Sequence, residues 1–96
     1  MSYQYHIVSD FDSPELFKKV ISGVHSSSDY VDTFLNAESA GFKYRNSESS
    51  WGSDIELYFN SDGLFLDVHA GNAKKLLAFI DNYLKKSNIL IEVEEL

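Results

Sequence analysis

The sequence lacks cysteine altogether, and this absence excludes a disulfide framework and any zinc site built on thiolate ligands. It also lacks a long hydrophobic run, since the longest unbroken apolar stretch is LLAFI at residues 76–80, far too short to span a bilayer. The first residues, MSYQYH, do not show the basic and then apolar pattern of a signal peptide. We therefore expect a cytoplasmic protein with no membrane partner.

Basic residues are scarce as well. Eight lysines and arginines stand against fifteen aspartates and glutamates, which gives a formal net charge of -7. Excess negative charge repels nucleic-acid backbones and anionic membranes and attracts basic proteins. Acidity also keeps a small protein in solution, so the charge alone does not require a partner. A basic protein is the partner that this composition favours, and nucleic acid is not expected.

The hydrophobic and aromatic content of the chain suits one compact core. The 96 residues are 44% hydrophobic and 15% aromatic, and no internal repeat, linker or low-complexity tract divides them. We expect a single domain over residues 1–96.

Local patterns in the first half of the chain predict one strand, two helices and a second strand. Alternating apolar and polar residues predict a strand around residues 3–8. A helix from Pro14 is predicted by apolar residues at i, i+3, i+4 and i+7, namely Phe17, Val20, Ile21 and Val24. Residues 29–38 are expected to form a second helix whose inward side chains are Val31, Phe34 and Leu35. A short strand is expected at 41–45.

The second half of the chain contains the strongest local signal. The Asp-Gly pair in NSDG, residues 60–63, lies between two alternating runs and supplies the positive φ of a tight β-hairpin. A last helix is predicted at 72–86, and a closing strand follows in NILIEVEEL. A right-handed crossover is expected to pair that strand parallel to a central one. The order β-α-α-β-β-β-α-β predicts an α+β sandwich, with a mainly antiparallel five-stranded sheet and helices on one face.

Two aspartates lie where the first strand gives way to the first helix. The stretch Asp10-Phe11-Asp12 resembles the first motif of the haloacid dehalogenase superfamily, in which the leading aspartate attacks phosphate. The glycine expected after Asp12 is Ser13, and the later acidic pair that holds magnesium has no counterpart. With Asp12 as N-cap, Glu15 falls at N3 of a capping box. We interpret the pair as a helix start.

The predicted hairpin divides its residues between two faces by strand parity. One face is aliphatic and is expected to lie under the helices: Ile55, Leu57, Phe59, Leu64, Leu66 and Val68. The other mixes carboxylates with aromatic rings, as protein interfaces do. We predict that it binds a partner through Asp54, Glu56, Tyr58, Phe65, Asp67 and His69, with Trp51 from the preceding turn.

Two other classes of function remain open. Asp67 and His69 project from the same side of one strand and form the centre of a hypothetical small hydrolase, with His6, Asp54 and Glu56 as conceivable further donors of a metal or acid-base site. Alternatively, the closing strand at Ile89–Val93 pairs with a second copy if it lies at a sheet edge. We expect no enzyme, no cofactor and no metal, and treat self-association as an alternative.

In size, charge and lack of a catalytic motif, the chain resembles the immunity proteins that bacteria pair with nuclease or other toxic domains. That resemblance implies a small acidic inhibitor that covers the functional surface of a basic toxin. A phage-encoded inhibitor of a host nucleic-acid enzyme fits the same physics. The sequence therefore predicts a protein-binding module and leaves these two sources of it open.

Overall fold

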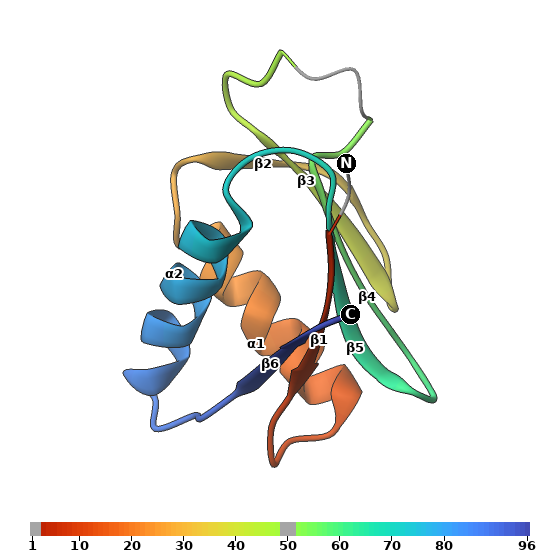
Figure 1. The fold of residues 1–96 in the computed structure, drawn as a ribbon, viewed down its shortest axis with the longest axis vertical. Helices are drawn as coiled ribbons and strands as arrows, with labels where there is room; N and C mark the ends of the chain where they lie inside the picture. Colours follow the sequence, from red (N-terminus) through yellow and green to blue (C-terminus); the bar gives the residue numbers. More distant parts are fainter. Residues whose placement is uncertain (1–2, 49–51) are drawn as a thin grey trace.

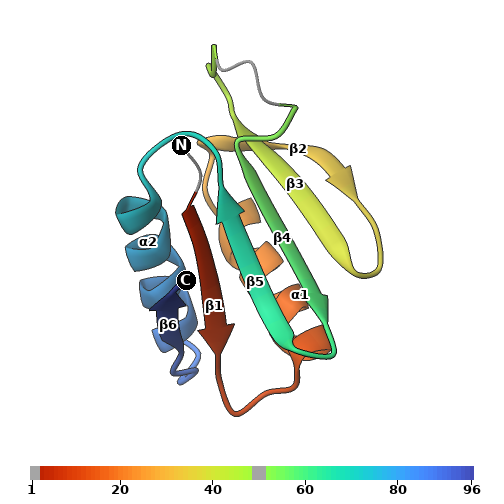
Figure 2. The ribbon, with the colours of Figure 1, turned by 45° about the vertical axis from the view of Figure 1, so that its right-hand side comes forward.

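The computed structural model describes residues 3–48 and 52–96, and over these it is an α+β protein with a six-stranded antiparallel sheet and two helices (Figure 1). The elements are β1 Tyr3–Val8, α1 Ser13–His25, β2 Tyr30–Leu35, β3 Ser39–Tyr44, β4 Ile55–Asn60, β5 Gly63–Val68, α2 Ala73–Lys85 and β6 Glu92–Glu95. The sheet order is β2-β3-β4-β5-β1-β6. Both helices lie on the same side of the sheet, as expected (Figures 1 and 2).

Each helix begins at a side-chain cap. The Asp12 carboxylate accepts a hydrogen bond from the Glu15 backbone N–H at 3.1 Å, which confirms Asp12 as the start of α1. At α2 the Asn72 side chain accepts from the Lys75 backbone N–H at 3.0 Å. Within the described residues, neither helix is long and apolar enough to cross a membrane.

The core lies between the helices and the aliphatic face of the β4–β5 hairpin. Ile55, Leu57, Leu64, Leu66 and Val68 are all at most 2% exposed, and they pack with buried residues of both helices. The predicted inward face of the hairpin is therefore confirmed. Asn60 pairs with Gly63, whose φ of +132° supplies the positive backbone angle that the tight turn requires.

The helix predicted at residues 29–38 is wrong, because this segment forms strand β2, antiparallel to β3. A bulge between Asp32 and Phe34 shifts the register, so that Val31 pairs with Lys43 and Phe34 with Gly41. The bulge thus brings two residues three apart onto one face of a strand, which imitates the spacing of a helix. The three side chains expected to face inward, Val31, Phe34 and Leu35, are all exposed.

The closing strand is also placed differently from the prediction. β6 is antiparallel to β1, its only neighbour among the described strands, and lies at the edge of the sheet, with Ile7 opposite Val93. β5 and β6 are both antiparallel to β1, so they run parallel to each other with β1 between them. The crossover through α2 therefore skips over one strand. With β2 included, the described sheet has six strands rather than five.

Candidate partner-binding surface

The side of the sheet opposite the helices is the candidate surface. In Figure 2 the sheet is in front of α1, and within the described residues no helix crosses its outer side. Strand pairing places β1 beside β5, so side chains of β1 share this side with those of the hairpin. We call it the open face and define it by Gln4, His6, Glu56, Tyr58, Phe65, Asp67 and His69.

Three rings form a row across the open face. Tyr58 and Phe65 are directly opposite each other, with ring centroids 5.6 Å apart and planes 24° from parallel. Phe65 also faces His6, at 4.9 Å and 18°. A Cβ at Gly63 would clash with the His6 imidazole, so glycine there leaves room for this ring. Cross-strand stacking thus fixes the aromatic row, Tyr58–Phe65–His6, on three neighbouring strands.

Two carboxylates lie directly opposite each other beside the aromatic row. Glu56 of β4 pairs in register with Asp67 of β5, an arrangement of like charges that destabilises a sheet. His69 Nε2 lies 3.2 Å from Glu56 Oε1. Asp67 Oδ1 is buried and has no hydrogen-bond partner among the described residues. The sheet therefore carries two acids at its centre at a cost in stability.

The Tyr58 side chain links β4 to β1 across the open face. Its hydroxyl oxygen accepts a hydrogen bond from Gln4 Nε2 at 2.7 Å. Burial and the negative charge of Asp67 raise the pKa of the Tyr58 hydroxyl above its usual value, so this group stays neutral and able to donate at physiological pH.

The expectation of an exposed Asp54 is wrong. Asp54 is 0% exposed, and its Oδ2 accepts a hydrogen bond from the backbone N–H of Tyr44 at 3.0 Å. Its backbone carbonyl accepts from the N–H of His69 at 2.7 Å. Asp54 precedes the first residue of β4, where side-chain direction is set by the local hydrogen bonds rather than by strand parity. It ties β3, β4 and β5 together, and Trp51 lies outside the described residues.

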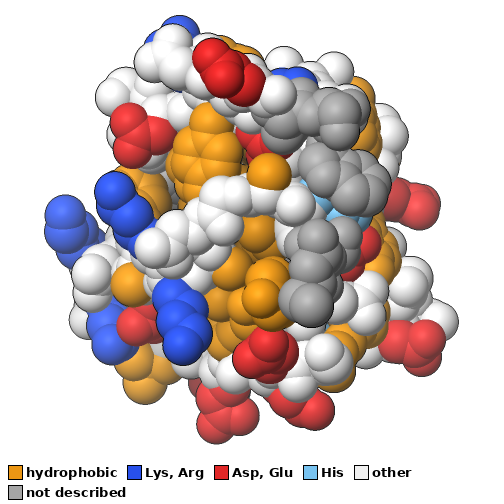
Figure 3. All heavy atoms as spheres, turned by 45° about the horizontal axis from the view of Figure 1, so that its top comes forward, with side chains coloured by type: hydrophobic (Ala, Val, Ile, Leu, Met, Phe, Trp, Pro, Cys, Tyr) orange, Lys and Arg blue, Asp and Glu red, His pale blue; other side chains and the backbone are white. Residues whose placement is uncertain are grey.

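Charge is divided between the two layers. The helices carry five lysines, Lys18, Lys19, Lys74, Lys75 and Lys85, and two acids, Glu15 and Asp81. The strands carry one lysine, Lys43, and the acids Asp32, Glu56, Asp67, Glu92, Glu94 and Glu95. Most of the basic side chains visible in Figure 3 lie at the left, over the helical layer. The helical layer is therefore net positive and the sheet layer net negative.

The alternative sites are placed as follows. His69 contacts Glu56 through its Nε2 atom, while His6 stacks on Phe65. Over residues 3–48 and 52–96, no group of three or more His, Cys, Asp and Glu side chains is arranged to hold a metal ion. The closing strand does lie at an edge, but β6 presents the exposed acids Glu92, Glu94 and Glu95, which repel a second copy.

Gln4 and His6 belong to the open face but were not predicted to do so. Their alternation with Tyr5 and Ile7 did place them on the polar side of a strand. Only the strand order puts that side next to Phe65 and Asp67.

Comparisons with protein-family models, with curated proteins and with solved structures find no match to this chain.

Proposed function

We propose that this protein is a cytoplasmic binding module that inhibits a basic protein partner by covering the partner's functional surface with the open face. The observation that carries the proposal is the aromatic row flanked by Glu56 and Asp67, on a side of the sheet that no described element covers. An immunity protein for a nuclease toxin has this character, and so has a phage inhibitor of a nucleic-acid enzyme.

The aromatic row supplies what the centre of an interface requires. Stacked rings are held rigid before binding, so little side-chain entropy is lost when a partner covers them. Six strands about 4.8 Å apart and about 20 Å long give an outer side on the order of 500 Å², against roughly 800 Å² per partner in a standard interface. This side therefore provides more than half of the contact area needed.

The carboxylates of the open face indicate which side chains the partner should present. Glu56 and Asp67 at the centre and Glu92 and Glu94 on β6 match lysines and arginines that a nucleic-acid enzyme uses for phosphate. The lysines of the helical layer lie on the opposite side of the sheet from the open face, so the protein would present its negative side to a basic surface. Electrostatic steering then speeds association at low salt.

Affinity capture from a native lysate tests the proposal, with the bound proteins identified by mass spectrometry. Glu56→Lys together with Asp67→Lys should abolish capture of the basic partner. The matched control, Asp10→Lys with Asp62→Lys, makes the same change of charge at exposed acids outside the open face and should retain it. Equal capture by both double variants would disprove the proposed surface.

A second pair of variants tests the rings. Phe65→Ala should weaken binding of the captured partner at least tenfold, because it removes the centre of the aromatic row. Phe11→Ala removes an exposed ring beside Lys19, away from the open face, and should leave the affinity unchanged. Isothermal calorimetry with the purified partner measures both.

A further inference from the structure

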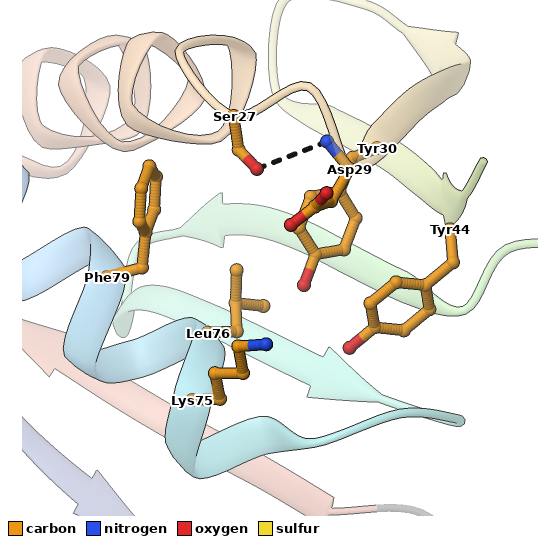
Figure 4. Close-up of a pocket in the computed structure, with 7 residues that line it drawn as sticks. All are labelled: Ser27, Asp29, Tyr30, Tyr44, Lys75, Leu76 and Phe79. Atoms are coloured by element: carbon orange, nitrogen blue, oxygen red, sulfur yellow. Dashed lines mark hydrogen bonds between the residues drawn. The ribbon is translucent and has the colours of Figure 1, made fainter.

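A cavity of about 90 Å³ lies between α2, the loop from α1 to β2, and the ends of β2 and β3 (Figure 4). Its apolar wall is formed by Tyr30, Leu76 and Phe79. The cavity opens into a groove of about 390 Å³ that shares Asp29, Tyr44 and Lys75 with it and continues along Arg45. It lies on the helical side of the sheet, so it is separate from the open face.

Two tyrosines give the cavity fixed polar groups. The Tyr44 hydroxyl oxygen accepts a hydrogen bond from the Asn72 backbone N–H at 3.2 Å, and its ring lies 4.7 Å from that of Tyr30. Gly71 has a φ of +93°, and a Cβ there would clash with the Tyr44 ring. Burial, together with a hydrogen bond to Tyr44, strongly raises the pKa of Tyr30. Both hydroxyls are therefore held in place as hydrogen-bonding groups.

Opposite charges line the same space without pairing. Asp29 comes from the loop before β2 and Lys75 from the first turn of α2, and both side chains border the cavity in Figure 4. Among the described residues, neither has an ion-pair partner. A simple anion here would face the Asp29 carboxylate, and a simple cation would face Lys75. Only a ligand with both charges is complementary to the two together.

We propose that this cavity binds a free α-amino acid with a small branched apolar side chain. The ammonium group lies at Asp29, the carboxylate at Lys75 and the Tyr44 hydroxyl, and the side chain against Leu76 and Phe79. A cavity of about 90 Å³ holds roughly three water-sized groups, which matches the isopropyl group of valine. This site goes beyond the proposed inhibitor function and does not depend on it.

Titration followed by ¹⁵N–¹H NMR tests the site with three probes: L-valine, 3-methylbutanoate, which lacks the ammonium group, and 2-methylpropylamine, which lacks the carboxylate. L-Valine should bind at least tenfold more tightly than either of the others. The shifted amides should cluster at residues 27–30, 44–46 and 71–79. No saturable shift in these segments with L-valine, or equal affinity for the three probes, would overturn the proposal.

Two variants assign the two charged ends. Asp29→Asn should weaken L-valine about tenfold and leave 3-methylbutanoate unaffected or tighter, whereas Lys75→Met should weaken both. Lys74→Met is the matched control, because Lys74 is next to Lys75 on α2 but does not line the cavity, and it should bind L-valine as the unaltered protein does. Unshifted resonances of the open face report that each variant is folded. If Asp29→Asn and Lys75→Met bound all three probes alike, the assignment of the ends would be wrong.

Discussion

The two sides of the β4–β5 hairpin differ although they belong to the same strands. Leu57 and Leu66 on the helical side are at most 1% exposed, whereas their neighbours Tyr58 and Phe65 on the open face remain partly accessible. The helical side holds the fold together by burying aliphatic surface. The open face carries opposed carboxylates that work against stability. The residues that stabilise the fold and those of the proposed binding surface therefore alternate along one hairpin, and the two properties should respond separately to mutation.

Leu66→Ala should have the largest effect on the free energy of unfolding. Removal of a fully buried leucine side chain costs about 2–5 kcal/mol, from lost burial and from the cavity that remains. Its neighbour on the other side, Phe65→Ala, should cost about 1 kcal/mol or less, since it removes only cross-strand contacts. Urea denaturation followed by circular dichroism measures both. Equal losses would show that the open face is part of the core.

Asp54→Ala should have the second largest effect on the free energy of unfolding. It leaves the partly buried N–H of Tyr44 without its acceptor and costs about 1–3 kcal/mol. The control is Glu56→Ala, whose side chain is 42% exposed and whose bond to His69 contributes about 1 kcal/mol or less. Amide hydrogen exchange at Tyr44 should accelerate only in Asp54→Ala. Unchanged exchange there would contradict the structural role of Asp54.

Alkaline pH should destabilise the protein through its tyrosines. The pKa values of Tyr30, on the helical side, and Tyr58, on the open face, are both raised, chiefly by burial. In the unfolded chain tyrosine ionises near pH 10, so their contribution is fully present below about pH 10 and is lost as pH rises above it. Tyr30→Phe should reduce this loss of stability at alkaline pH more than Tyr58→Phe does, because the pKa of Tyr30 is raised further. Urea denaturation between about pH 8 and pH 11 tests the order.

Asp67→Asn should have the smallest effect and the opposite sign. It removes the repulsion with Glu56, so the free energy of unfolding should rise by about 0.2–1 kcal/mol while capture of the basic partner weakens. Asp62→Asn, in the turn of the same hairpin, is the control and should change neither by as much. A loss of stability in Asp67→Asn would mean that the carboxylate supports the fold.

The sequence predicted those parts of the fold that depend on neighbouring residues. The alternation in residues 55–68, the turn at Gly63 and the cap at Asp12 are each fixed within a few positions of the chain. The strand at residues 30–35 was missed because its bulge places Val31 and Phe34 on one face at a helical spacing.

The candidate site was only partly predictable, because some of its residues are brought together by the pairing of strands that are distant in the sequence. Parity placed Glu56, Tyr58, Phe65 and Asp67 correctly on the outer side of the sheet. His6 joins them only through the pairing of β1 with β5, which brings together residues nearly sixty positions apart. Asp54 was misplaced because its side chain follows the hydrogen bond to Tyr44 beyond the end of the ladder.

The position of β1 has a consequence for how the chain is made. Its neighbours are β5 and β6, so Tyr3–Val8 finds no partner until Gly63–Val68 has been synthesised, and its second partner, Glu92–Glu95, comes later still. Contacts between such distant segments form slowly, because a long loop must close first. A nascent fragment that ends before β5 lacks both Phe65 and the strand that holds His6 beside it. The β1 part of the sheet can therefore be completed only after β5 and β6 have been synthesised.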